Sequence, residues 1–374
     1  MLSDGNPMEP LSATAAIAPA FSRVQGILFH PFRLGRSWKL AASNYLAFCG
    51  SIFVPLPLFF VPFLLSPGIQ TGKLLAVFLP LLVTLPYLIL FYFGVGMGLV
   101  TFDMVVTRGQ FIAPMWRRVA ARIWPWAGVK FLVGIALSAL MSPIAFMTAH
   151  HMQSAMVMVP RTPGQPPDLA AVHALWATMF GVYALLFVFY FVLKIASTLL
   201  DDFVRPFYLL EPITLRAAFA CGARICMAEP GEVLLYLLMK VVLGVAGFLM
   251  QYISYFVVLL ALAIVGVVLG LFGYAIIHLV GHGNPAASKL LLIAAAALLY
   301  VVCAVVVCWY AVGSIGYILL LLEAYGVYFL AGRYPLLGRL LDSGPGAPFA
   351  PPPVFRSPEE GPPGPPFPMD PAVA

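Results

Sequence analysis

Two stretches of the chain, residues 233–281 and 290–331, are almost continuously apolar. A helix needs about 20 apolar residues to cross a bilayer, so each stretch is longer than one simple crossing. Across the chain 62% of the residues are hydrophobic and 9% are charged, whereas charged residues make up about a quarter of an average soluble domain. Backbone groups in lipid must be bonded within the protein, and the period-two alternation of a membrane barrel is missing here. The sequence therefore predicts an all-α integral membrane protein.

Four shorter apolar stretches precede these two, and each is long enough for one span. They lie near residues 40–65, 74–102, 126–148 and 175–200. Six transmembrane helices require the two long stretches to project beyond the membrane or to bend. Eight require tight hairpins near Gln251 and Gly313, where turn signals are missing at the first position and modest at the second. We therefore expect about six spans, with eight as the alternative.

Three basic, aromatic stretches are suited to short helices in the membrane interface. They begin near residues 21, 104 and 203, and two spans follow each of them. The second and third copies share an acid, a proline and an arginine fourteen residues after the acid: Asp103, Pro114 and Arg117, and Asp202, Pro212 and Arg216. The chain is thus interpreted as three weak repeats of an interfacial helix plus two spans.

Basic residues are sorted between the two ends of the expected spans. Three lie on one side, at Lys73, Arg161 and Lys289. Fourteen lie on the other side, both termini included: Arg23, Arg33, Arg36, Lys39, Arg108, Arg117, Arg118, Arg122, Arg205, Arg216, Arg224, Arg333, Arg339 and Arg356. The positive-inside rule puts this second side and both termini in the cytoplasm. Because membrane orientation explains the net charge of +6, we expect no nucleic-acid partner.

The two ends of the chain differ in composition from the membrane domain, residues 21–341. Residues 1–20 carry acids and prolines where a signal peptide has basic and apolar regions, so we expect a disordered, uncleaved leader. Residues 342–374 are rich in proline and glycine, a composition that predicts a disordered tail with polyproline II character. The tail or the interfacial helices are the places where a protein partner would bind. A passive tail is the interpretation we favour, because nothing in it marks a specific ligand.

Three segments combine short polar motifs with apolar runs. They are RVQGILFHPFRLGRSWKLAASNYLAFCG, which begins at Arg23, LLDDFVRPFYLL, which begins at Leu199, and YILLLLEAYGVYFLAGRYPLL, which begins at Tyr317. These segments resemble an uncharacterised family of bacterial multi-pass membrane proteins. More distantly, the three-repeat layout is similar to the membrane domain that accompanies some glycerophosphodiester phosphodiesterases, although an apolar, histidine-containing stretch around 253–310 departs from it and no phosphodiesterase domain is present. The resemblance implies the membrane fold and a location in the bacterial inner membrane, and it implies no functional residues.

Four charged residues lie inside the expected spans, at Lys130, Lys194, Lys240 and Glu323. An ionisable group in lipid is costly, so each is a candidate functional residue. We expect Lys130 to extend its amine to the nearby cytoplasmic interface. Glu323 has a shorter side chain and is expected to pair with Lys194 or Lys240. Such a pair fixes the helix register, or the three residues line a cytoplasm-facing polar pocket for a lipid headgroup or a small anion.

An acidic pair, Asp201-Asp202, lies where the fourth span is expected to end, as Asp103 lies at the end of the second. Pro206 should end the helix soon afterwards, and Arg205 is placed to pair with Asp202 three positions before it. These boundary acids are therefore interpreted as the exit of a helix from lipid. A divalent cation site or a catalytic pair is the weaker alternative, because adjacent helical residues point in different directions.

Histidines and cysteines provide only weak metal signals. His278 and His282 are four residues apart and would form half of a metal site on one helix face, without the glutamate of an HExxH motif. Three further histidines lie near methionines that could complete a copper site: His150, His151 and His173. Polar helix ends explain both groups more simply, and the five cysteines and the glycines at 94–98 are explained as packing residues. No metal and no cofactor is expected.

The sequence does not identify a biochemical activity. The hypothesis we favour is a non-enzymatic scaffold or regulatory subunit of the membrane. The alternative is a transporter or lipid-handling protein that uses a polar pocket around Lys194, Lys240 and Glu323. An enzyme acting through Asp201 and Asp202 is a third and weaker hypothesis.

Overall fold

The computed structural model describes residues 11–30, 33–50, 73–157, 169–280 and 285–342, and those residues form helices and no strand. The helices are α1 (Ile17–Phe29), α2 (Leu34–Cys49), α4 (Lys73–Thr107), α5 (Ile112–Val157), α6 (Leu169–Leu199), a π-helical turn η2 (Leu200–Val204), α7 (Arg205–Leu210), α8 (Leu215–Ala228), α9 (Pro230–Val280), α10 (Pro285–Ala331) and α11 (Pro335–Asp342). Pro230, Pro285 and Pro335 each occupy the first position of a helix, where a missing N–H has no cost. The predicted all-helical class is confirmed.

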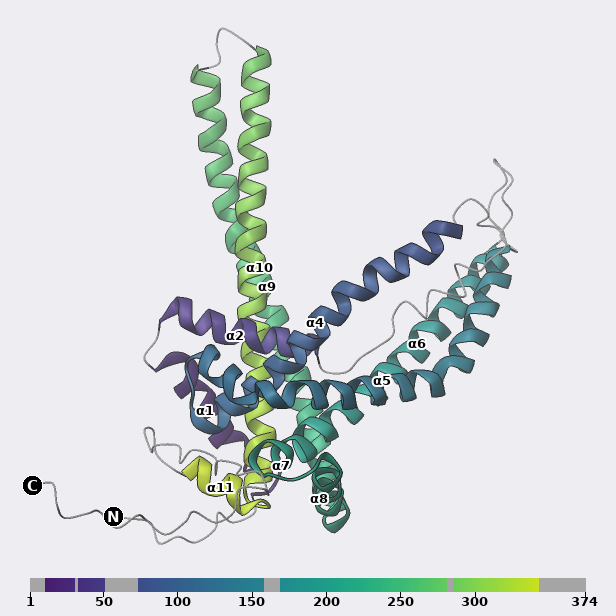
Figure 1. Cartoon of the computed structure of the whole chain (residues 1–374). Coiled ribbons are helices and arrows are strands. Elements are labelled where there is room, and N and C mark those ends of the chain that lie inside the picture. Colours follow the sequence, from purple (N-terminus) through teal and green to yellow (C-terminus); the bar gives the residue numbers. More distant parts are fainter. Residues whose placement is uncertain (1–10, 31–32, 51–72, 158–168, 281–284, 343–374) are drawn as a thin grey trace, which may run out of the picture.

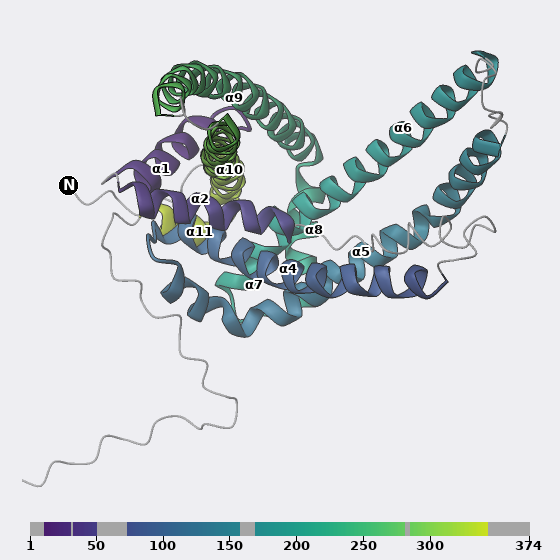
Figure 2. The same ribbon diagram turned by 90° about the horizontal axis from the view of Figure 1, so that it is seen from above.

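The helices form a base from which two arms diverge (Figure 1). One arm is the long antiparallel hairpin of α9 and α10, which rises at the top of the view. The other arm consists of α4, α5 and α6 and leaves toward the upper right. The short helices α1, α7, α8 and α11 surround the lower ends of both arms, and the view from above shows α6 and α9 leaving the base in different directions (Figure 2). The base therefore connects all the long helices.

Both long apolar stretches form single continuous helices. Gln251 lies inside α9 and Gly313 lies inside α10, so neither position is the tight hairpin that eight spans would require. Five helices in the described part of the chain are long and apolar enough to cross a membrane: Thr84–Thr107, Ile112–Leu140, Met179–Leu210, Pro230–Leu279 and Ser288–Ala331. The first expected span, 40–65, is described only as far as residue 50, where it includes the end of α2.

The second repeat differs from the prediction of a separate interfacial helix before the third span. Residues 112–157 form one helix, α5, with Pro125 and Pro143 inside it. A proline removes one backbone hydrogen bond and bends a helix without always ending it. The basic, aromatic segment before Pro125 is thus the first part of a long helix, and the repeat pattern does not mark a break here.

Aromatic side chains fill the base where the two arms meet. Tyr236 of α9 is fully buried and stacks on Tyr325 and Phe329 of α10, with ring centroids 5.1 and 4.4 Å apart. Phe203 of the π-helical turn meets the Tyr236 ring edge-on, with the centroids 5.6 Å apart. Offset-stacked and edge-on pairs are favourable beyond the apolar area that they bury. This cluster fixes α9 and α10 against the end of α6.

Helix α2 lies across both arms and passes very close to them (Figure 1). A Cβ added to Gly316 of α10 would overlap the Ala41 backbone of α2, and one added to Gly50 would overlap the Gly94–Val95 backbone of α4. Small residues allow such close approach of helix backbones. The α2 helix therefore fastens the α9–α10 hairpin to the other arm.

Residues 11–20 differ from the prediction of a disordered leader over 1–20. Ala13, Ala16 and Ala20 have no exposed surface, and the Tyr325 hydroxyl donates a hydrogen bond to the Ala13 carbonyl at 3.0 Å. Small alanine side chains pack closely against a helix surface, and this packing orders a segment whose prolines and acids alone suggest disorder. Residues 1–10 and 343–374 lie outside the described part of the chain.

The N-terminal helix also completes the end of α4. Arg23 of α1 is buried, and its Nε and Nη2 atoms donate to the Val105 and Val106 carbonyls at 2.8 and 2.6 Å. These carbonyls belong to the last turn of a helix, which has no further N–H groups to bond them. Burial lowers the pKa of the Arg23 guanidinium to about 10. The interaction therefore closes the C-terminal end of α4.

Candidate functional site

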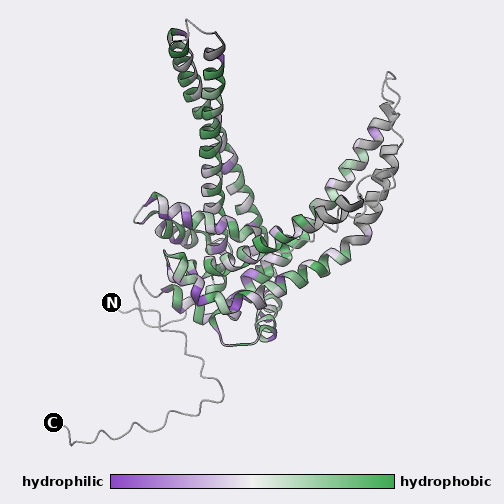
Figure 3. Ribbon diagram, turned by 45° about the horizontal axis from the view of Figure 1, so that its top comes forward, coloured by the Kyte–Doolittle hydropathy of each residue, from purple (hydrophilic) through white to green (hydrophobic). Residues whose placement is uncertain are grey.

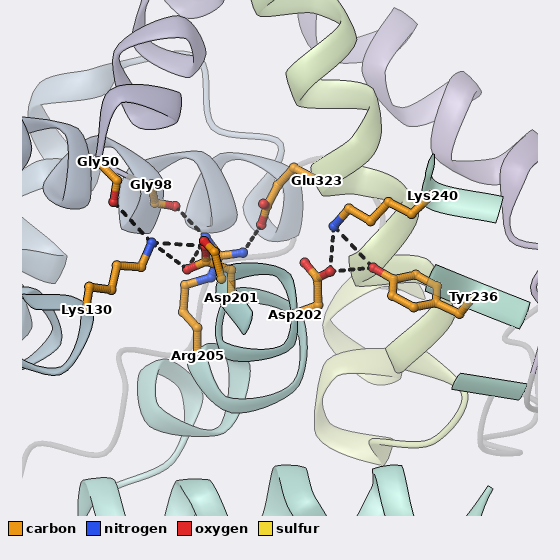
Figure 4. A network of polar contacts seen from close by, with 10 residues as sticks. Gly50, Gly98, Lys130, Asp201, Asp202, Arg205, Tyr236, Lys240 and Glu323 are labelled. Carbon is orange, nitrogen blue, oxygen red and sulfur yellow. Dashed lines mark hydrogen bonds and ion pairs between the residues drawn. The ribbon is translucent and has the colours of Figure 1, made fainter. Parts of the chain in front are cut away.

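The candidate site is built on a widened turn at the end of α6. Residues 200–204 form a π-helical turn, and Pro206, which lacks an N–H, follows in the first turn of α7. Single π-helical turns are frequent at functional sites. The turn carries Asp201 and Asp202, which leave the helix toward different neighbours, as adjacent helical residues do. Asp201 faces α5 and Asp202 faces α9 (Figure 4).

Asp201 is bonded to Lys130 of α5. The Lys130 ammonium lies 2.8 Å from Asp201 Oδ1 and 2.9 Å from Oδ2, and it also donates to the Gly50 carbonyl at 3.3 Å. Ser197 donates a further hydrogen bond to Asp201 Oδ2 at 3.2 Å. The expectation that Lys130 extends its amine to the interface is therefore wrong, because a carboxylate within reach inside the protein satisfies the buried ammonium.

Asp202 is bonded to two residues of α9. The Lys240 ammonium lies 2.5 Å from Asp202 Oδ2, and the Tyr236 hydroxyl donates to the same oxygen at 2.6 Å. Gly326 is the residue of α10 that lies beside this carboxylate. A Cβ added to Gly326 would lie 3.0 Å from Asp202 Oδ1 and 2.8 Å from the Tyr236 hydroxyl. A glycine is thus required for α10 to pass beside the ion pair.

Arg205 joins the remaining elements. Its Nη2 donates to Glu323 Oε1 of α10, its Nη1 donates to the Gly98 carbonyl of α4 at 3.0 Å, and Asp201 Oδ1 lies 4.0 Å from Nη1. The guanidinium also lies over the Phe102 ring, 5.3 Å from its centroid. Arginine is suited to such a position because its planar donors reach several acceptors at once.

Two of the predicted pairings are corrected by this geometry. Glu323 was expected to pair with Lys194 or Lys240, and it pairs with Arg205 instead. Arg205 was expected to pair with Asp202, and its nearer aspartate is Asp201, one helical turn before it. The cause is that Asp202 points to α9, where it holds Lys240, while Arg205 points to α4 and α10.

The result is a network in which three carboxylates and three cations are paired across the base (Figure 4). The pairs are Lys130–Asp201, Arg205–Glu323 and Lys240–Asp202, and they join α5, η2, α7, α9 and α10. We call these six residues the charge network. Removing one partner of a buried pair costs roughly 3–5 kcal/mol, because the other charge stays buried without compensation. The network is therefore able to hold the two arms in one register.

Lys194, the third lysine of the predicted pocket, stands apart from these pairs. Its ammonium lies over the Phe48 ring of α2, 5.0 Å from the centroid, and its charged neighbours include Lys240, Asp201 and Lys130. The predicted set of Lys194, Lys240 and Glu323 is thus brought to one region. Two of its three members are already held by other residues.

The remaining boundary acid, Asp103, forms its own ion pair. Asp103 Oδ2 lies 2.8 Å from Nη2 of Arg118, whereas the predicted repeat pointed to Arg117. Asp202 is equally unrelated to Arg216, which is exposed on α8. The spacing of fourteen residues that the two copies share does not correspond to an ion pair in either copy.

The predicted metal ligands do not form a cluster in the described residues. Groups of three or more His, Cys, Asp or Glu side chains that could hold a metal ion are missing from that part of the chain. His278 lies beside the Tyr274 ring, with centroids 6.0 Å apart, and His282 is outside the described residues. The side chains of His150 and His151 are not described either.

An apolar groove of about 570 Å³ lies beside the charge network, where α6 and α9 diverge above α8. It is lined by Val133, Ala196, Leu199, Leu200, Phe203, Val204, Phe219, Gly222, Ala223, Cys226, Pro230, Val233, Leu234 and Leu237. Burial in this groove raises the pKa of the Cys226 thiol. The lining holds no charged group, so the groove is suited to apolar chains and not to a polar substrate.

Sequence reasoning missed three members of this site, Arg205 as its centre, Tyr236 and Gly326. A signal for the first was present, because Asp201 and Arg205 have the i, i+4 spacing of a helical ion pair. The other two act only through contacts between helices that are far apart in the sequence.

A sequence profile for a family of unknown function, DUF7544, matches residues 11–340. The chain belongs to this family. The match covers the base and both arms, and it begins at the residue where the described structure begins. No curated protein and no solved structure matches the chain. Membership of this family agrees with the prediction of an uncharacterised family, and it transfers no activity to the charge network.

Proposed function

We propose that this protein is a multi-pass protein of the bacterial inner membrane that acts as a non-enzymatic scaffold or regulatory subunit, with the base and both termini on the cytoplasmic side. The observation that carries the proposal is the difference in apolar length between the α5–α6 pair and the α9–α10 hairpin, seen from the level of the charge network.

The charge network supports a common membrane boundary for the long helices. Lys130, Lys194, Lys240 and Glu323 each stand directly beside a run without Asp, Glu, Lys, Arg or His. The runs are 131–149 in α5, 174–193 in α6, 241–277 in α9 and 290–322 in α10. Since these four residues lie near one another in the base, the apolar runs all begin at one level. We infer that the hydrocarbon layer begins there.

The α5 and α6 runs have the length of a single crossing. They contain 19 and 20 residues, which correspond to about 30 Å of helix, the thickness of the hydrocarbon core. Exposed arginines such as Arg117 and Arg216 lie on the base side of the network. The positive-inside rule supports a cytoplasmic base on that ground.

The α9 and α10 runs are longer than a bilayer requires. They contain 37 and 33 residues, which correspond to about 50–55 Å of apolar helix. Their outer parts project large apolar side chains, such as Leu271 and Leu279 of α9 and Tyr300 of α10, which are 67%, 76% and 75% exposed. Figure 3 shows the hairpin as hydrophobic along its length, while polar residues gather in the base.

Lipid alone accounts for about 20 residues of each hairpin helix. Apolar surface beyond that length needs another cover, and helices of a partner protein would provide it. The closed pairing of the charge network agrees with a structural role, because each of its carboxylates already holds a cation. A scaffold that offers the outer hairpin to a partner explains both features.

Site-specific photo-crosslinking in the host cell tests this function. A photoreactive residue at Leu271, in the outer hairpin, should give a protein adduct of discrete mass in the tagged full chain. The same residue at Leu132, an exposed position of α5, should give lipid adducts and serves as the matched control. Lipid adducts alone at both positions would contradict a scaffold role for the hairpin.

A further inference from the structure

The charged groups in the centre of the base do not sum to zero. Four cations gather there, Lys130, Lys194, Arg205 and Lys240, against the three acids Asp201, Asp202 and Glu323. Each acid is bonded to a cation other than Lys194. Lys194 is therefore the one cation of this cluster that no carboxylate of the described residues bonds.

The adjoining sequence offers Lys194 no acid either. The Phe48 ring beneath its ammonium belongs to the last turn of α2, and residues 51–72, which follow, contain neither Asp nor Glu. A cation–π contact supplies only part of what an ammonium loses on leaving water. A positive charge next to apolar surface thus calls for an anion from outside the chain.

The surroundings of Lys194 show where such an anion would enter. Lys194 lies on α6 and Lys240 lies on α9, two helices that leave the base in different directions (Figure 2), and Lys240 is a charged neighbour of Lys194. The Lys240 side chain is 16% exposed, whereas Lys130 on the inner side is 4% exposed. Lys240 is thus more accessible than Lys130, and Lys194 is half-buried.

Exposed apolar side chains follow the two lysines on both helices. Tyr190 and Phe191 are exposed on α6, and Val241 and Val245 are exposed on α9. They stand within about one turn of Lys194 and Lys240, on the side of the apolar runs. The two lysines are thus followed by exposed apolar side chains along both helices.

We propose that Lys194, with Lys240 beside it, binds the headgroup of an anionic glycerophospholipid whose acyl chains lie against the exposed faces of α6 and α9. An ammonium binds phosphate as a point charge. Basic openings between membrane helices on the cytoplasmic side are suited to such headgroups. The site rests on the membrane placement proposed above, since a lipid reaches it only if the hydrocarbon layer begins at this level.

The exposed apolar side chains of α6 and α9 favour a lipid over a free anion. Inorganic phosphate would gain the contact with the two lysines and leave the adjoining surface uncovered. A phospholipid supplies the same phosphate chemistry and also covers the exposed apolar side chains of α6 and α9.

Native mass spectrometry of the purified full chain in a mild detergent tests the site. The protein is offered equal amounts of phosphatidylglycerol and phosphatidylcholine with identical acyl chains. The wild type should retain phosphatidylglycerol about tenfold over phosphatidylcholine, a difference that one ion pair of about 1.4 kcal/mol provides. Lys194→Met and the milder Lys194→Gln should bring this ratio close to one, and Lys194→Arg should preserve it. Lys289→Met, which removes an exposed lysine at the start of α10, is the matched control and should leave the ratio unchanged.

The ratio also decides between the sources of the anion. Equal retention of both lipids by the wild type, or an unchanged ratio in folded Lys194→Met and Lys194→Gln, would overturn the proposal. Displacement of phosphatidylglycerol by excess inorganic phosphate, with no preference left for the lipid, would assign the site to a free anion and overturn it as well. Because the ratio is measured in detergent, its failure is distinct from a failure of the membrane orientation, which is tested in intact cells.

Discussion

The α5–α6 pair and the α9–α10 hairpin leave the same charge network and differ in how far they continue as apolar helix. In α5 and α6 the apolar runs have 19 and 20 residues, and in α9 and α10 they have 37 and 33. The first pair matches one crossing of the hydrocarbon core, and the second exceeds it by about 20 Å. The network lies at the inner end of both, where it sets a common level.

The difference in apolar length distinguishes two kinds of apolar surface that composition alone does not tell apart. Apolar surface that matches a bilayer needs only lipid as its cover, whereas apolar surface beyond it needs lipid and a further partner. The hairpin diverges from the other arm (Figure 1), so an inclination of the hairpin would shorten its projection across the membrane. A typical tilt of about 20° shortens it by only a few ångströms, which leaves the excess.

The largest expected effect comes from opening the charge network that both arms share. Asp202→Ala leaves the Lys240 ammonium and the Tyr236 hydroxyl without their carboxylate. We expect the free energy of unfolding to fall by roughly 3–5 kcal/mol, measured by thermal or denaturant unfolding of the purified protein in detergent.

A double variant is the control for this loss. Asp202→Asn combined with Lys240→Met removes both charges of the pair and should recover most of the stability. A double variant as unstable as Asp202→Ala would show that the loss comes from packing and not from an uncompensated charge.

A smaller effect is expected where α2 fastens the hairpin to the other arm. Gly316→Ala places a methyl group against the Ala41 backbone, which cannot move away as a flexible side chain would. The expected loss is about 1–3 kcal/mol, the usual cost of overpacking. In Gly273→Ala the added Cβ has nothing within 4 Å, so this control in the outer hairpin should be neutral or stabilising by up to about 1 kcal/mol. Equal losses in both variants would break the contrast between base and hairpin.

Shortening the hairpin sharpens the comparison further. Deletion of residues 262–272 from α9 together with 295–305 from α10 removes about three turns from each helix and retains the facing sides. The outer hairpin has few contacts with the rest of the molecule (Figure 1), so the expected change in stability is smaller than for Gly316→Ala. The protein adduct from the outer hairpin should disappear. Persistence of that adduct from the shortened hairpin would place the partner elsewhere.

The smallest expected change in stability is at Lys194. Because no acid of the described residues bonds this ammonium, Lys194→Met removes a charge without leaving a partner unpaired. The free energy of unfolding in lipid-free detergent should stay the same or rise slightly. A loss comparable with that of Asp202→Ala would show that Lys194 belongs to the charge network.

The architecture was predictable wherever the structure of a segment depends mainly on its own sequence. Composition and apolar length predict the all-helical class, and the weak turn signals at Gln251 and Gly313 favour continuous helices. The predicted disordered leader reached too far along the chain, because Ala13, Ala16 and Ala20 become ordered only through the helices that cover them.

Some members of the candidate site were predictable from the sequence, and their pairings were not. A charged residue in an apolar run is visible in the sequence, so Lys130, Lys194, Lys240 and Glu323 were identified. Which carboxylate each cation reaches depends on the distance and rotation between helices, and also on a π-helical turn that no local pattern marks. Consequently Glu323 pairs with Arg205 and not with the lysines that the sequence analysis proposed.

The central claim is that the base lies in the cytoplasm and that the apolar runs of both arms leave it into the membrane. Labelling with an impermeant maleimide tests this directly, in a chain whose native cysteines are replaced and which carries Arg216→Cys or Lys289→Cys. The account predicts that cysteine at 289 is labelled in intact cells, and that cysteine at 216 is labelled only after the cells are permeabilised. Labelling at 216 in intact cells, with 289 protected, would contradict it.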